Sequence, residues 1–195
     1  MAKKLINSVG SFYQHYPRIP LIVTASHQGR DNGMAVAWHM PMSKNPPLIA
    51  FVTGTSHFTY RLIKESGEFA VNLLPETHAE LVAAIGGSKG EECDKFATYG
   101  ISKEKSVKTS APILADAYAA FECKVVEEKL YEGHSMVIGE VVATHIQEEY
   151  FYDDGTLNME KVNPVLYLGS EQYLNIKQAN IHTLKREVYA KELKL

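Results

Sequence analysis

The stretch that decides the fold is residues 117–147, AYAAFECKVVEEKLYEGHSMVIGEVVATHIQ. Residues 119–125 alternate between apolar side chains and the charged Glu122 and Lys124. This two-residue period is typical of a strand with one buried side and one side facing solvent. A second long run follows the polar segment 131–134. The pattern predicts two long antiparallel strands, over 117–129 and 135–147.

Further strands are predicted upstream, between residues 19 and 53. Strand-like segments cover 21–24, 34–38 and 48–53, and Arg30-Asp31-Asn32-Gly33 separates the first two. An Asn-Gly pair between extended runs is a strong hairpin signal, so we expect the turn there. Residues 48–52 are apolar without alternation, which predicts a strand covered on both faces.

Short helices are predicted between the strands. They cover residues 57–65, 75–85 and 92–99, with a strand over 69–74 after the first and a last strand over 165–168. This order indicates a mainly β protein, a β-barrel with short helices, and not a parallel βαβ fold. No repeat or linker divides the chain, so residues 1–195 are expected to form one domain with a charged C-terminal tail at about 180–195.

Composition excludes several classes of protein. The net charge of −3 and the pI near 6.2 argue against nucleic-acid binding. Cys93 and Cys123 lie far apart without CxxC spacing, which argues against disulfide, zinc-ribbon and thioredoxin sites. No signal-peptide pattern or apolar run of membrane-spanning length is found, so we expect a cytoplasmic protein without membrane contact.

The turn Gly54-Thr55-Ser56-His57-Phe58-Thr59 is a candidate anion site, because it joins a buried strand to a helix. Backbone N–H groups at a helix start attract phosphates, and the hydroxyls of this segment add donors. The alternative is that Thr55 or Ser56 only caps the helix. Nucleotide-binding and common hydrolase motifs, such as GxGxxG, GxxxxGK[ST], HExxH and GxSxG, do not occur.

Four other residues have both a functional and a structural interpretation. Trp38, the single tryptophan, is either a core residue or a flat wall for an aromatic ligand. His134 is a ligand donor or an ordinary turn residue, and Lys95 is a phosphate contact or a solvated helix lysine. Glu140, among apolar neighbours, is a hydrogen-bonded structural acid or a site residue. The histidines show no metal-ligand spacing, so no metal site is expected.

Taken together, several segments resemble the flavin reductase-like, FMN-binding split-barrel family, most closely its flavoredoxin branch. Their order and spacing over about residues 17–170 carry the resemblance, whereas no single segment is specific. A pyridoxamine phosphate oxidase, which has a related barrel, fits this order poorly. The segments are PLIVTA (20–25), DNGMAVAW (31–38), PPL (46–48), FAVNL (69–73), DKF (94–96) and HSMVIGEV (134–141).

The resemblance implies a six-stranded split barrel of Greek-key topology, a homodimer, and one noncovalent FMN per subunit near the dimer interface. It also implies roles for individual residues: phosphate contacts from Thr59 and Lys95, and His134 as the catalytic pocket residue. The implied cofactor-binding residues are Asn32, Ala37, Trp38, Ser43, Thr53, Ser56, Thr59, Lys95, His134 and Tyr167.

The expected function is that of a flavin reductase or ferric reductase. Electrons would pass from NAD(P)H or a protein donor through FMN to a small-molecule or protein acceptor. One alternative is an FMN-binding electron carrier or sensor without nicotinamide-dependent turnover. Another is a structural or interaction protein on the same barrel that has lost its ligand.

Overall fold

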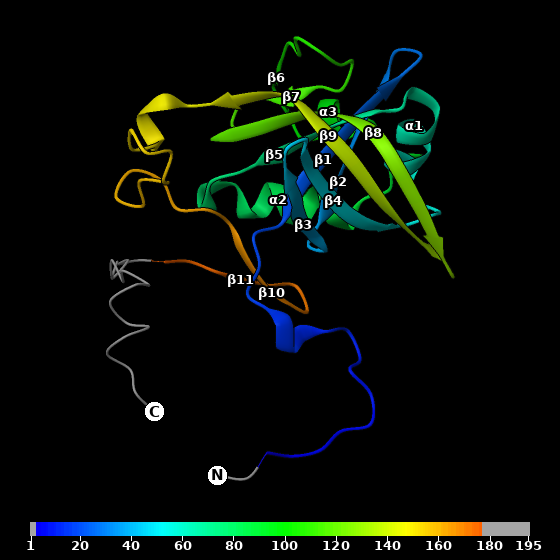
Figure 1. Cartoon of the computed structure of the whole chain (residues 1–195), viewed down its shortest axis with the longest axis vertical. Coiled ribbons are helices and arrows are strands. Elements are labelled where there is room, and N and C mark those ends of the chain that lie inside the picture. The colour runs from blue at the N-terminus through cyan, green and yellow to red at the C-terminus, as the bar shows by residue number, and fades with distance from the viewer. Residues whose placement is uncertain (1–2, 177–195) are drawn as a thin grey trace.

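Residues 3–176 are described by the structure, a computed structural model of the chain (Figure 1). Seven antiparallel strands form one sheet in the order β2-β1-β5-β8-β9-β4-β3. Neighbours such as β1 and β5, or β4 and β9, are distant in sequence, which gives the Greek-key connections. The mainly β prediction is therefore confirmed, whereas the predicted tail at about 180–195 lies outside the described residues.

The strands of the main sheet are β1 (Leu21–His27), β2 (Arg30–Val36), β3 (His39–Lys44), β4 (Pro47–Gly54), β5 (Glu68–Leu73), β8 (Ala119–Tyr131) and β9 (His134–Ile146). Two smaller ribbons pair β6 (Lys103–Glu104) with β7 (Ile113–Leu114) and β10 (Leu166–Gly169) with β11 (Gln172–Leu174). The α-helices are α1 (Phe58–Ser66), α2 (Ala79–Gly87) and α3 (Lys95–Thr98). Short 3₁₀ turns cover Tyr13–His15, Glu76–His78 and Glu148–Tyr150.

The two long strands predicted from residues 117–147 are β8 and β9, which form the long ribbon in Figure 1. The alternation places Glu122 on the solvent side of β8, and this is wrong, because its side chain is fully buried. The register of β8 against β9 shifts between Glu122 and Cys123. A bulge of this kind redirects side chains and interrupts the two-residue period.

Buried Glu122 is surrounded by donors. Its carboxylate accepts hydrogen bonds from the backbone N–H groups of Val107, Lys108 and Thr109, from the Thr109 hydroxyl, and from Nε2 of His145, at 2.7–3.0 Å. Burial by itself raises the pKa of Glu122, but these donors more than offset it and lower the pKa to about 2. The carboxylate therefore ties the segment 105–111 to the barrel wall.

The β1–β2 turn differs from the prediction. Gln28 and Gly29 form it, with φ of 49° and 76°, between the paired residues His27 and Arg30. Two consecutive residues with positive φ match the twist of a hairpin, and glycine adopts that conformation without steric cost. The expected turn residue Asn32 instead lies inside β2, where it is buried.

Strand β3 was not expected from the sequence, and it brings the main sheet to seven strands where the resemblance implies six. It contains Pro41 and a register shift between Pro41 and Ser43, features that fit an edge strand. The chain passes from β2 into β3 through Ala37 and Trp38, and the Trp38 carbonyl accepts a hydrogen bond from the Val52 N–H of β4 at 2.8 Å. This corner connects the two edges of the sheet.

The barrel interior is filled by apolar side chains from every wall. Phe51 of β4 and Phe69 of β5 meet edge to face at 5.2 Å, and Ile63 of α1 packs against the same cluster. Gly139 makes this fit possible, because a Cβ there would come within 2.4 Å of the Phe69 ring. The predicted helix over 57–65 is confirmed as α1, and its apolar residues join this core.

A second core lies between α2 and the sheet. Ile22 of β1 packs there with Val82 and Ile85 of α2 and with Phe96 of α3. Helix α2 begins at Ala79, after the 3₁₀ turn Glu76–His78, and ends at Gly87, so the predicted range of 75–85 is shifted at both ends. Helix α3 is shorter than its predicted range of 92–99. The α2–α3 connection packs on β2, since a Cβ at Gly90 would lie 2.3 Å from the Asn32 side chain.

Candidate functional site

The start of α1 lacks a side-chain cap. His57 is the N-cap residue, and no side chain among the described residues accepts from the first helical N–H groups. The interpretation that Thr55 or Ser56 caps the helix is therefore wrong: Thr55 points to the Gly133 carbonyl, and Ser56 is exposed. Unpaired N–H groups and the helix dipole together favour an anion at this place.

Lys95 is only 3% exposed, and its charge acts on His57 at the start of α1. Its ammonium donates to the carbonyls of Gly33, at 2.9 Å, and Ile85, at 2.7 Å. No carboxylate of residues 3–176 forms an ion pair with it. Burial lowers the pKa of Lys95. The interpretation as a solvated helix lysine is wrong, and a buried cation without a countercharge remains.

Asn32 connects Lys95 to α1. It neighbours Gly33, and its Nδ2 donates to Oγ1 of Thr59 at 2.9 Å. Gly90, in the loop after α2, packs directly on this amide, since a Cβ at Gly90 would lie 2.3 Å from Nδ2. Asn32, Thr59 and Lys95 are all buried, so the structure brings three predicted contacts into one polar cluster.

Thr53 extends the cluster toward the surface. Its hydroxyl lies 2.9 Å from Nδ1 of His57 and 3.3 Å from the sulfur of Met34. Burial is the main cause that lowers the pKa of His57, and the nearby positive charge of Lys95 adds to it. At neutral pH this favours the uncharged imidazole at the start of α1.

Trp38 and His134 form a flat wall beside the polar cluster. Their rings stack at 5.8 Å with an interplanar angle of 27°, and His134 is paired with Gly54 in the β4–β9 register. Trp38 is 37% exposed, which excludes the core interpretation. Its Nε1–H donates to the Tyr16 hydroxyl at 3.2 Å. His134 is the first residue of β9 and not, as predicted, part of the turn.

The remaining predicted residues are less closely connected. The Tyr167 ring packs edge to face on Tyr16, which holds Trp38. Ala37 and Tyr167 both line a cavity between β2 and α2. Ser43 lies along β3 and accepts from the Asn45 N–H, and Ser56 is exposed beside the start of α1. No contact among the described residues brings Ser43 into the polar cluster.

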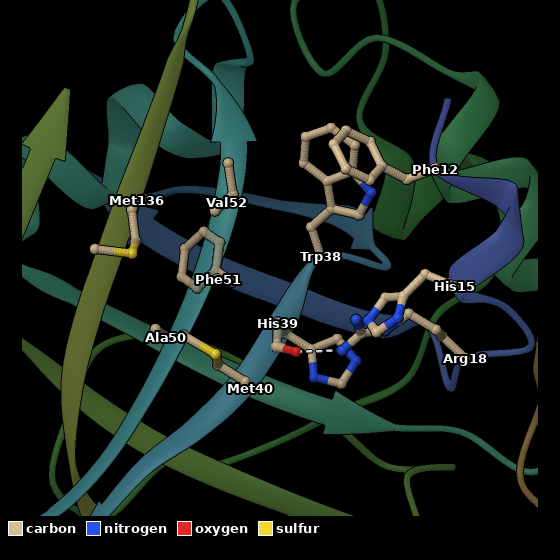
Figure 2. A pocket seen from close by; sticks show the side chains of 10 residues that line it. All are labelled: Phe12, His15, Arg18, Trp38, His39, Met40, Ala50, Phe51, Val52 and Met136. Atoms are coloured by element: carbon tan, nitrogen blue, oxygen red, sulfur yellow. Dashed lines mark hydrogen bonds between the residues drawn. The ribbon is translucent and has the colours of Figure 1, made fainter. Parts of the chain in front are cut away.

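A cavity of about 270 Å³ opens next to Trp38 (Figure 2). Its lining is mostly apolar, with Arg18, His15 and His39 together at one end. Sequence reasoning missed the N-terminal contribution of Phe12 and Tyr16, because residues 3–18 carry no regular pattern.

The predicted absence of a metal site concerns the whole chain. Within residues 3–176, no group of three His, Cys, Asp or Glu side chains is placed to hold a metal ion. None of the helices in this range is long and apolar enough to cross a membrane.

Sequence comparison assigns the chain to a family. The sequence profile named "Flavin reductase like domain" matches residues 13–172, so the chain belongs to this family. An uncharacterised protein of Aeropyrum pernix is 34% identical to this chain over 79% of its length. The match spans 58% of the length of that relative. A ferric-chelate reductase (NAD(P)H) of Archaeoglobus fulgidus is 32% identical, over 66% of this chain and 75% of the relative.

Structural comparison agrees with this assignment. The flavoredoxin of Desulfovibrio vulgaris (Miyazaki F) superimposes with a TM-score of 0.82 and 25% identity, over 96% of this chain and 100% of that chain. The fold is therefore that of the split-barrel flavin reductases and flavoredoxins.

Proposed function

We propose that the protein binds FMN noncovalently and acts as a flavin reductase-like oxidoreductase. The observation that carries the proposal is buried Lys95, which has no countercharge in the described part of the chain and lies beside the uncapped start of α1. A buried cation is costly unless an anion neutralises it. Membership of the flavin reductase-like family supports a flavin as the source of that anion.

The polar cluster fits the phosphate of FMN. The α1 N–H groups and the Lys95 ammonium supply donors and positive charge. Because the Thr59 oxygen accepts from Asn32, its own O–H remains available to donate. The carbonyls of Gly33 and Ile85 hold Lys95 in place, so the site is formed before a ligand arrives.

The wall formed by Trp38 and His134 fits a flat ring system. When bound, FMN supplies the redox chemistry. We assign His134 a catalytic role: it would donate a proton to, or accept one from, a ring nitrogen of bound FMN. His134 is exposed and stacked on Trp38. Tyr167 supports this wall through Tyr16, whereas Thr53 contacts His57 at the start of α1.

NAD(P)H is the proposed electron donor, with a protein donor as the other possibility. The ferric-chelate reductase relative is named for NAD(P)H, which supports the nicotinamide version. The exposed face of Trp38 leaves room for a donor at the surface. The second candidate function, an FMN electron carrier or sensor without nicotinamide turnover, is favoured by the similarity to a flavoredoxin.

The decisive experiment is an FMN titration of the purified protein, followed by anaerobic addition of NADH and then NADPH. The Lys95→Met variant is expected to bind FMN at least about tenfold more weakly, because it loses a charged donor to the phosphate. Lys105→Met, which removes an exposed lysine elsewhere, serves as the control. No flavin binding by the wild type would overturn the proposal, and binding without bleaching would leave the carrier function.

We also propose that the protein is a homodimer. The N-terminal segment extends away from the barrel (Figure 1). Apolar side chains on this segment and on β3 are exposed, including Leu5, Ile6, Met40 and Met42. A second copy of the chain would cover them and thereby remove apolar surface from water. Light scattering at micromolar concentration tests this: a mass of one chain would contradict it.

A further inference from the structure

The cavity of about 270 Å³ next to Trp38 has a marked asymmetry (Figure 2). Trp38, Phe12, Val52 and Met136 give most of it an apolar surface. Phe12 meets Trp38 edge to face at 5.7 Å, so two aromatic rings form one wall. Ligand pockets in proteins usually measure about 300–1,000 Å³, so this cavity suits a small, flat molecule.

The opposite end of the cavity carries a positive charge. Arg18 is half-buried there, and one of its guanidinium nitrogens donates to the His39 carbonyl. No carboxylate within residues 3–176 pairs with it. A guanidinium has five N–H donors in a fork that matches a carboxylate, so donors remain available for a ligand.

The backbone of Arg18 is held independently of its side chain. Its N–H and carbonyl form a two-way bridge with the backbone of Tyr167, at 3.0 and 2.8 Å. The fold therefore fixes the backbone of Arg18, and a substitution of the side chain leaves this bridge intact.

Two histidines complete the polar end. His39 lies with Nε2 2.7 Å from the Ile19 carbonyl, which can only accept, so this nitrogen carries the proton. Burial, opposed in part by this hydrogen bond, lowers the pKa of His39, and the ring is neutral at neutral pH. His15 is exposed at the rim. Arg18 is thus the permanent charge among the lining residues.

We propose that this cavity binds a small, flat molecule that carries a carboxylate, with Arg18 holding the carboxylate and Trp38 and Phe12 covering the ring. The cavity shares Trp38 with the proposed flavin wall and Met40 with the face that a second copy would cover. As the site of the molecule that exchanges electrons with the protein, it rests on the proposed function.

The test uses benzoate as the probe, together with benzamide, which has the same shape without the charge, and acetate, which has the charge without the ring. Trp38 is the single tryptophan, so its fluorescence reports directly on the cavity of the flavin-free protein. Calorimetry gives the same affinities for the protein loaded with FMN, in which flavin emission would interfere. FMN affinity is measured separately by flavin absorbance.

Benzoate is expected to bind at least about tenfold more tightly than benzamide or acetate. Arg18→Gln should lose that advantage, Arg18→Lys should keep part of it, and the charge-matched control Lys105→Gln should keep it all. FMN affinity should be unchanged in all three variants, which separates failure of this site from failure of the flavin site.

Three results would overturn the proposal: equal binding of benzoate and benzamide, unchanged benzoate affinity in Arg18→Gln, or displacement of benzoate by FMN. The last result would assign the cavity to the flavin itself.

Discussion

The two buried charges Glu122 and Lys95 differ in how far the protein itself satisfies them. Glu122 accepts five hydrogen bonds from one segment and one histidine, and all its partners belong to the protein. Lys95 is as deeply buried but has only two carbonyl partners and no ion pair in the described part of the chain. A charge that the fold satisfies internally indicates a structural role, whereas one left without a countercharge indicates a ligand.

The largest change in stability is expected for a substitution of Glu122. Glu122→Gln should lower the free energy of unfolding by about 2–4 kcal/mol, because an amide cannot accept all the donors that the carboxylate holds. Urea denaturation measures this. Glu68→Gln is the matched control, since Glu68 binds Ser110 of the same segment but is half-exposed, and its loss should be below about 1 kcal/mol.

The pH dependence of stability tests whether the charge of Glu122 is the cause. The pKa of Glu122 is depressed from its ordinary 4.5 to about 2. The carboxylate therefore stabilises the fold above pH 4.5, by on the order of 3 kcal/mol, and this contribution is lost as the pH falls from 4.5 through 2. Wild type and Glu122→Gln should converge in stability over this window. A difference that stays constant with pH would show that the carboxylate charge is not the cause.

Gly90 packs on Asn32 of the polar cluster, so a substitution there tests the proposed ligand site. Gly90→Ala places a Cβ within 2.3 Å of the Asn32 amide, so Asn32 must move and its bond to Thr59 is broken. We expect a loss of about 1–3 kcal/mol in the free energy of unfolding, together with weaker FMN binding. Gly87→Ala, where a Cβ meets nothing within 4 Å, is the control. Equal behaviour of the two variants would argue against a tightly packed Asn32.

The smallest effect is expected for Lys95 in the flavin-free protein. Lys95→Met removes a buried charge and should raise the free energy of unfolding by about 1 kcal/mol at neutral pH. Because the pKa of Lys95 is lowered by burial, the cost of its charge is present at neutral pH and is relieved as the pH rises toward the ordinary value of 10.5. The gain should shrink accordingly.

Phosphate gives the complementary measurement on Lys95. Added inorganic phosphate should raise the melting temperature of the wild type and leave that of Lys95→Met unchanged, because a ligand stabilises only the state that binds it. A strongly destabilised Lys95→Met variant would place Lys95 with Glu122 among the structural charges.

Much of the fold could be predicted from the sequence because its strands are long and patterned. Strands β8 and β9 and helix α1 follow from local periodicity. The Asn-Gly pair predicts the β1–β2 turn at Asn32 and Gly33, whereas Gln28 and Gly29 form it. The tertiary structure overrides that signal, because Asn32 is used to hold Thr59 and Gly33 to hold Lys95.

The site could be predicted only in part. Asn32 and Lys95 from the quoted segments lie in one polar cluster and Trp38 stacks on His134, while their roles toward a flavin stay predictions. The apolar neighbours of Glu140 predict a hydrogen-bonded structural acid or a site residue, but Glu140 is half-exposed and its carboxylate has no hydrogen bond among the described residues. Glu122 fills that role, and only the bulge in β8, which the sequence pattern does not reveal, explains why.

The two thiols differ as much as the two charges. Cys123, opposite the β5 wall, is fully buried, and burial raises its pKa to about 12, whereas Cys93 is half-exposed in the loop between Gly90 and Lys95. A thiol-reactive dye should therefore label one cysteine in the native protein and two in urea. Labelling stoichiometry then counts unfolded molecules, and a dye on Cys93 provides a spectroscopic reporter beside the polar cluster.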